Sequence, residues 1–184
     1  MDLAAHQRAL LELIEAGPGA AGADDDEYLR SVAASDGLRV LREIVAHWEA
    51  YDVRRTCPLT ATALERSGRF AEAVGAVRFE ASSAFLDERV STFLDDVADA
   101  EGGVVASVAR FERALVAVRR GEPGRHVIEW DRDPAVVVNG LLEGRWLADE
   151  AEPGRYRTVV DPASPELVTI ELEAEATRSK SAGR

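Results

Sequence analysis

Gly121-Glu122-Pro123-Gly124, followed by His126-Val127-Ile128-Glu129-Trp130, divides the sequence into two parts with different residue patterns. Glycine and proline in the first stretch interrupt regular structure. The second stretch is short, β-branched and aromatic, which is typical of a strand. We therefore expect helices before this point and a sheet after it.

Before residue 120, apolar residues recur every three or four positions, the spacing of amphipathic helices. Residues 2–16 predict the first helix. A later helix is expected to be capped by Asp36 and to end near Tyr51. Its apolar stripe, expected to face the protein core, comprises Leu38, Leu41, Ile44, Val45 and Trp48. Pro58 interrupts the pattern, and Thr60 is a suitable cap for a short helix after it.

After residue 124, Asp133-Pro134 predicts an N-cap followed by proline at the first helical position. Tyr156 to Val160 and Leu167 to Leu172 are interpreted as strands, separated by the turn-forming sequence Asp161-Pro162-Ala163-Ser164-Pro165. The expected fold class is α+β, with a mainly α-helical N-terminal bundle at 1–120, a small α+β unit at 121–172 and a flexible tail at 173–184.

Composition restricts the possible partners. The 184 residues carry a net charge of −12, which repels nucleic-acid phosphates and anionic lipids. No apolar run approaches the ~20 residues of a membrane span, and Met1-Asp2-Leu3 does not start a signal peptide. We therefore predict a cytoplasmic protein with neither nucleic acid nor membrane as its partner.

Residues capable of catalysis or metal binding are few. Cys57 is the only cysteine, and no neighbouring residue would lower its pKa, so we favour a buried thiol over a nucleophile. Glu43 lies one helical turn from His47 and could complete half of a metal site, but we find no partner motif on a second helix. We assign no catalytic residue and no metal ligand.

Charge is distributed unevenly along the chain. The segment 87–101 has a net charge of −5, whereas 107–125 contains five arginines and has a net charge of +3. This arginine cluster could attract an acidic partner, or it could pair with the acidic helix before it. The pattern favours neither alternative.

Several degenerate segments, spread over about residues 7–172, carry a family resemblance. They are Gln7-Arg8-Ala9-Leu10-Leu11, Cys57-Pro58-Leu59-Thr60 with Leu64 and Gly68, Phe93-Leu94, Val108-Ala109-Arg110-Phe111-Glu112-Arg113-Ala114-Leu115, Trp130 with Asp133-Pro134, and Leu141-Leu142-Glu143-Gly144. Together they resemble the partner subunits of multinuclear non-heme iron-dependent oxidases, such as the methanobactin-biosynthesis partner subunit and its relatives in peptide natural-product maturation.

The resemblance implies a non-catalytic subunit that forms a heterodimer with an iron oxidase. It would help present the leader of a ribosomally synthesised precursor peptide, whose cysteine the oxidase modifies. The iron would belong to the oxidase, so no cofactor is expected in this chain. Some relatives are labelled DNA-binding domains, which conflicts with the charge of −12. The alternatives are an enzyme that uses Cys57 or His47, and a helical regulator that contacts nucleic acid through the arginine cluster.

Two surfaces are predicted for these partners. For the oxidase we select Phe111, because Arg110 and Arg113 flank its apolar stripe. For the leader we select an open strand edge that accepts another strand, the alternative being an interior or hairpin strand with both edges covered. Its residues would be Val168, Ile170 and Leu172, with Trp130 or Tyr156 as aromatic walls. A proline at Thr169 should remove one backbone donor from that edge.

Overall fold

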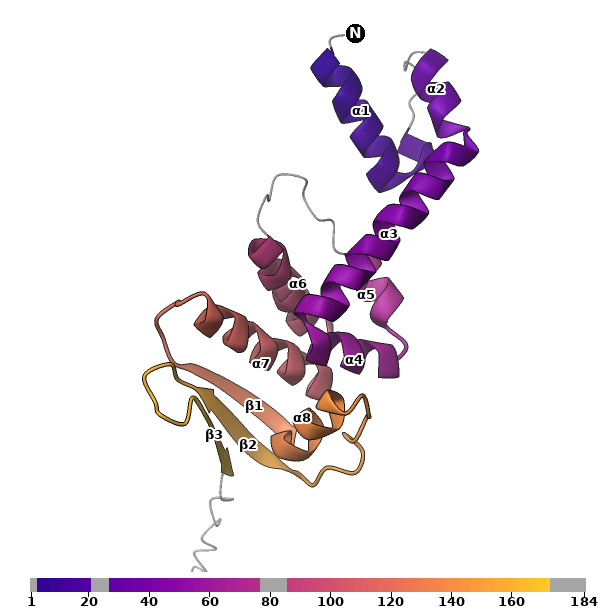
Figure 1. Cartoon of the computed structure of the whole chain (residues 1–184). Helices are drawn as coiled ribbons and strands as arrows, with labels where there is room; N and C mark the ends of the chain where they lie inside the picture. The colour runs from indigo at the N-terminus through magenta and orange to yellow at the C-terminus, as the bar shows by residue number, and fades with distance from the viewer. Residues whose placement is uncertain (1–2, 21–26, 77–85, 173–184) are drawn as a thin grey trace, which may run out of the picture.

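The computed structural model describes residues 3–20, 27–76 and 86–172 (Figure 1). Its helices are α1 (Leu3–Ala16), the 3-10 turn η1 (Pro18–Ala20), α2 (Glu27–Ala33), α3 (Asp36–Thr56), α4 (Pro58–Arg66), α5 (Phe70–Ala76), α6 (Leu86–Ala100), α7 (Gly103–Arg119) and α8 (Pro134–Leu142). Its strands are β1 (His126–Arg132), β2 (Pro153–Val160) and β3 (Val168–Leu172). The predicted α+β class and the change of structure after residue 120 are both confirmed. The tail predicted at 173–184 lies outside the described residues.

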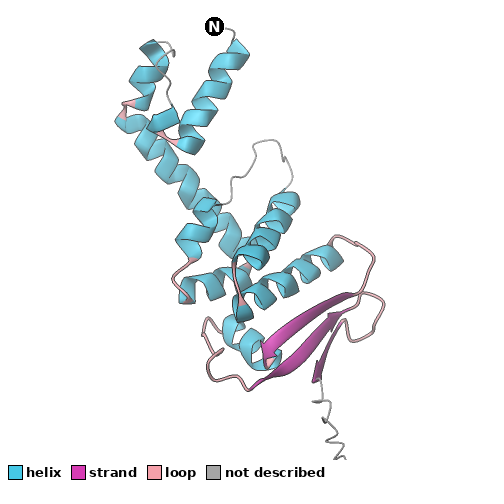
Figure 2. Cartoon of the chain, turned by 180° about the vertical axis from the view of Figure 1, so that it is seen from behind, coloured by secondary structure: helices cyan, strands magenta, loops and turns pink. Residues whose placement is uncertain are grey.

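The three strands form one antiparallel sheet in the order β1-β2-β3. Helices α7 and α8 lie against one face of this sheet (Figures 1 and 2). The register pairs Trp130 of β1 with Tyr156 of β2, and Tyr156 with Leu172 of β3. Because directly opposite residues point to the same face, these three side chains share the helix-facing side of the sheet.

Three hydrophobic cores hold the described elements together. The smallest joins α1, α2 and the start of α3 through Leu13, Leu29 and Leu38, and we call this part the arm. A second core joins the end of α3 to α4, α5, α6 and α7. The third joins α4, α7 and α8 to the sheet, so that α7 and β1, on either side of the boundary expected at residue 120, share one core.

Helix starts follow local capping rules in some places and tertiary contacts in others. Asp133 caps α8 as expected, because its carboxylate accepts from the Ala135 N–H at 2.8 Å. At α3 the cap is Ser35, whose hydroxyl accepts from the Leu38 N–H at 3.2 Å, and Asp36 is already in the helix. Thr60 does not cap α4, because that helix begins two residues earlier at Pro58.

The prediction that one stripe of α3 faces the core was wrong for most of its residues. Leu41, Ile44 and Trp48 are 42%, 48% and 59% exposed, and only Leu38 and Val53, near the two ends, are buried. The physical reason is that α3 connects two separate cores, the arm at its start and the α4–α7 core at its end (Figure 2). Its central turns therefore remain outside both.

None of the helices within 3–20, 27–76 and 86–172 is sufficiently long and apolar to span a bilayer.

Candidate functional site: the open edge of the sheet

Strand β3 forms one edge of the sheet. In the described part of the chain it pairs with β2 alone, so its other side carries no strand. Such an edge presents unpaired backbone N–H and C=O groups in the arrangement that another extended chain requires. Within the described residues β3 is therefore an edge strand, as predicted, and peptide binding at this edge stays a prediction.

The direction of the β3 backbone groups follows from the turn that precedes it. The Asp161 N–H donates to the Leu167 carbonyl at 2.8 Å, which marks this opposite pair as hydrogen-bonded. Hydrogen-bonded and non-bonded pairs alternate along an antiparallel ladder. Thr169 and Glu171 therefore direct their backbone groups toward β2, whereas Ile170 and Leu172 direct theirs to the open side.

The side chains at this edge extend the core beyond its helical cover. Val168, Ile170 and Leu172 lie opposite Val160, Thr158 and Tyr156, and hence on the helix-facing side of the sheet. The β2 partners are buried, but Ile170 is 47% and Leu172 is 65% exposed. We call Val168, Ile170 and Leu172 the β3 shelf, because they form an apolar surface beside an open backbone edge.

The strand begins at Val168 and not at Leu167. Leu167 has a φ of 35°, which lies outside the β region of the backbone and ends the preceding turn. The Asp161 side chain accepts from the Ala163 N–H at 2.9 Å, which stabilises the predicted turn. The position of this turn fixes the register of β3.

Trp130 and Tyr156 are not walls of an exposed groove. They are only 3% and 8% exposed and belong to the core between the sheet and the helices. The Trp130 ring packs edge-on against Phe111 of α7, with the ring centroids 6.0 Å apart. Side chains alternate between the two faces along each strand, which places both rings on the helix-facing side of the sheet, where α7 and α8 cover them.

The oxidase surface expected around Phe111 is also buried at its centre. Phe111 is 7% exposed, since α7 packs against other helices on one side and against the sheet on the other. Arg110 donates to the Ala98 carbonyl at 2.9 Å, and Arg113 lies 3.4 Å from the Asp95 carboxylate. Arg110 and Arg113 thus contact the preceding helix α6, as one of the two interpretations expected, whereas Arg120 forms its ion pair with Glu122.

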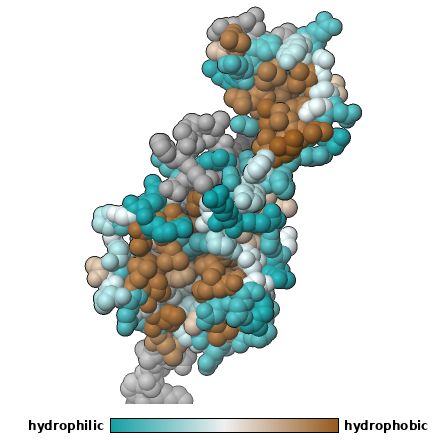
Figure 3. All heavy atoms as spheres, viewed as in Figure 1, coloured by the Kyte–Doolittle hydropathy of each residue, from teal (hydrophilic) through white to brown (hydrophobic). Residues whose placement is uncertain are grey.

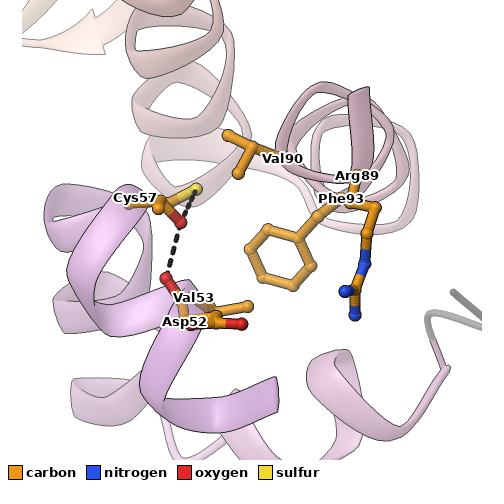
Figure 4. A pocket seen from close by; sticks show the side chains of 7 residues that line it. Asp52, Val53, Cys57, Arg89, Val90 and Phe93 are labelled. Carbon is orange, nitrogen blue, oxygen red and sulfur yellow. Dashed lines mark hydrogen bonds between the residues drawn. The ribbon is translucent and has the colours of Figure 1, made fainter. Parts of the chain in front are cut away.

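Cys57 lies beside a small hollow between α3 and α6, which is partly open to solvent (Figure 4). The Phe93 ring and Val90 face the thiol across this space, and the Thr56 hydroxyl is 3.7 Å from its sulfur. Burial raises the pKa of Cys57 to about 12, and the negative charge of Glu112 adds to the effect. The thiol is therefore protonated at neutral pH, which argues against its use as a nucleophile.

His47 lies on the exposed side of α3, beside Trp48. Across the described ranges, no three His, Cys, Asp or Glu side chains are grouped closely enough to hold a metal ion. His47 and Glu43 are therefore not joined there by further ligands.

The sequence identified Val168, Ile170 and Leu172 as a set but did not show which backbone groups face outward. Which alternate residues of β3 direct their backbone groups to the open side depends on the Asp161–Leu167 hydrogen bond, and that bond depends on the conformation of the turn. The Pro162 and Pro165 positions that define the turn are the available sequence signal. They show that a turn exists but do not determine which pair closes it.

Comparison with known proteins identified no relative: no family model matches the chain, and neither a curated protein nor a solved structure is significantly similar to it.

Proposed function

We propose that this chain is a non-catalytic partner subunit that binds a multinuclear non-heme iron oxidase. In that complex it presents the leader of a ribosomally synthesised precursor peptide for cysteine modification. The identity of the oxidase rests on the family resemblance of the sequence segments. Peptide binding rests on the β3 edge.

The observation that carries the proposal is the combination of an open backbone edge with the β3 shelf. An extended peptide can add to β3 as a fourth strand, and main-chain hydrogen bonds then supply affinity. Ile170 is central, because its N–H and C=O both face the open side and its side chain is 47% exposed. Alternate peptide side chains would rest on Ile170 and Leu172, which supplies register.

The outward groups at Ile170 allow a direct test. A proline at 170 removes the outward N–H without removing a donor to β2. We expect Ile170→Pro to weaken binding of a synthetic leader at least tenfold, measured by calorimetry. Proline at Thr169 is a poorer test than the sequence suggested, because the Thr169 N–H faces β2 and its loss would detach β3 itself.

A matched control is available on the opposite edge of the same sheet. The Ser107 hydroxyl donates to the Glu129 carbonyl of β1 at 2.8 Å, so the backbone of Glu129 faces away from β2. Val127, two residues earlier, has the same parity and a 51% exposed side chain. Val127→Pro should therefore leave leader affinity unchanged. Equal affinity of the leader for a folded Ile170→Pro variant would refute binding at β3.

Binding of the oxidase is tested by a separate experiment. Co-expression with the neighbouring oxidase should yield a stable complex on size-exclusion chromatography, with iron in that complex. If the complex forms but does not bind the leader, the chain is an oxidase partner that does not present the peptide. Failure of the two proteins to associate would remove the partner role.

A further inference from the structure

The central turns of α3 carry an exposed apolar surface that the preceding sections leave unused. It consists of Val40, Leu41, Ile44, Trp48 and Tyr51, which are between 42% and 59% exposed, and we call it the α3 stripe. At about 100° per residue, all five side chains lie within an arc of about 100° on the helix. The Trp48 and Tyr51 rings are in edge-on contact, with centroids 5.6 Å apart. Tryptophan and tyrosine are the residues most enriched at the energetic centres of protein interfaces.

Among the described residues, the stripe lies on the side of α3 away from the two cores that this helix joins. The contacts of α3 come from its other side, where Leu38 enters the arm core and Val53 enters the α4–α7 core. Arg42, on that same side, donates to the Ile14 carbonyl of α1 at 3.0 Å. The helical wheel places these packing residues about 110–170° from the centre of the stripe. A second molecule can therefore approach the stripe without displacing the described contacts.

The spacing of the stripe fits another helix of the same sequence. Leu41, Ile44, Trp48 and Tyr51 follow one another at intervals of three, four and three residues, as at the a and d positions of a coiled coil. We propose that a second copy of this chain docks on the α3 stripe, with the two α3 helices antiparallel about a two-fold axis. Leu41 of each copy then meets Tyr51 of the other, and Ile44 meets Trp48.

This pairing is complementary in shape and charge. Each large aromatic ring lies on an aliphatic side chain, so that bulky and smaller groups alternate along the contact. At each end of the stripe, Arg55 of one copy lies next to Asp36 of the other. Asp36 is accessible for this pairing, with a side chain that is 96% exposed and a 3.7 Å contact to Arg39 in its own helix. Such a closed, two-fold contact matches the commonest symmetry of protein oligomers.

The size of the stripe sets the expected affinity. Five half-exposed large side chains present about 500 Å² per copy, and about 1,000 Å² in a dimer. That is near the lower limit for a specific interface, so weak, concentration-dependent association is expected. The protein should therefore be monomeric when dilute and dimeric when concentrated.

Sedimentation velocity of the full chain, from about 1 to about 300 μM, tests the proposal directly. We expect the weight-average mass to rise from that of a monomer to that of a dimer. Trp48→Glu should weaken association at least tenfold, because it places two buried charges in each dimer. Val127→Glu is the matched control, since Val127 is 51% exposed but lies on the sheet. Circular dichroism establishes that both variants are folded.

Cysteine cross-linking tests the antiparallel arrangement. A Leu41→Cys, Tyr51→Cys double variant should form disulfide-linked dimers on mild oxidation, and each single variant should not. The native Cys57 does not interfere, because it is fully buried. Cross-linking of the single variants would instead indicate parallel helices and overturn the arrangement.

A chain that remains monomeric over the whole concentration range overturns the proposal. If Trp48→Glu then impairs the complex with the oxidase, the stripe belongs to that partner and not to a second copy. A dimer that Trp48→Glu leaves intact overturns the proposal as well, because it assigns self-association to another surface.

Discussion

Replacing Glu112 by alanine should destabilise the protein far more than removal of a surface carboxylate. Glu112 lies on α7 and is 4% exposed. Its carboxylate accepts from the backbone N–H groups of Leu59 at 3.1 Å and Thr60 at 2.8 Å, in the first turn of α4. Pro58 has no N–H, and the N–H of Ala61 donates to the Cys57 carbonyl. Glu112 thus performs the capping that no side chain within α4 provides.

The expected magnitude follows from these two hydrogen bonds. In Glu112→Ala two buried N–H groups lose their acceptor, at a cost of about 1–3 kcal/mol each. Removing a buried carboxylate offsets part of this, since burial raises the pKa of Glu112 despite the hydrogen bonds that lower it. We expect a net loss of about 2–4 kcal/mol in the free energy of unfolding.

Urea denaturation followed by circular dichroism measures this loss. The control is Glu122→Ala, because Glu122 makes partly exposed ion pairs with Arg113 and Arg120. Its removal should cost at most about 1 kcal/mol. Hydrogen exchange at Leu59 and Thr60 should accelerate in Glu112→Ala alone. If the two variants were equally stable, the capping role of Glu112 would be refuted.

Four further outcomes are expected. The raised pKa of Glu112 favours its protonated form in the folded state. The stability of the wild type relative to Glu112→Gln should therefore fall as the pH rises from about 4 through that raised pKa. Urea titrations that give a constant difference between the two proteins would contradict the pKa shift. Cys57, with its pKa raised to about 12, should resist iodoacetamide at neutral pH in the folded protein and react fully in denaturant, as mass spectrometry can show. Phe111→Ala should cost about 3–5 kcal/mol by denaturation, because Phe111 is packed against Trp130, whereas a small loss would indicate a looser core. Gly140→Ala should destabilise by about 1–3 kcal/mol, since an added Cβ would lie 2.7 Å from Leu147 Cγ, and an unchanged melting curve would show that Leu147 moves freely.

Local chemistry was sufficient to predict the elements whose signals lie within a few residues. Asp133-Pro134 starts a helix because the aspartate side chain and the fixed φ of proline act within one turn. The turn after Asp161 is equally local. Glu112 is different, because its partners lie 53 and 52 residues away along the chain. Its sequence neighbours gave no sign that it caps α4.

Helical spacing shows which side chains share a face, but it does not show what covers that face. Both α3 and α7 carry regular apolar stripes, and the sequence predicted a buried stripe for α3 and a partner surface for α7. The structure shows the opposite pattern of burial, with Trp48 59% exposed and Phe111 7% exposed. The difference arises because α7 contributes to two cores along its length. The middle of α3, in contrast, lies between the arm core and the α4–α7 core and belongs to neither.

Figure 3 shows apolar side chains gathered on the arm and again over the sheet-containing end of the molecule. Among the described residues, the arm core contains three buried apolar side chains, Leu13, Leu29 and Leu38, with partly buried ones packed around them, which is a small core for three helices. Contacts on the α3 stripe would not enlarge that core, because the stripe lies on the side of α3 away from Leu38, but they would hold the helix on which the arm packs. The β3 shelf, in contrast, extends a core that is already large. We therefore expect partner binding at the stripe to stabilise the arm, and peptide binding at β3 to change the stability of the body by less. Amide hydrogen exchange in each complex distinguishes the two effects, because each protects a different part of the same chain.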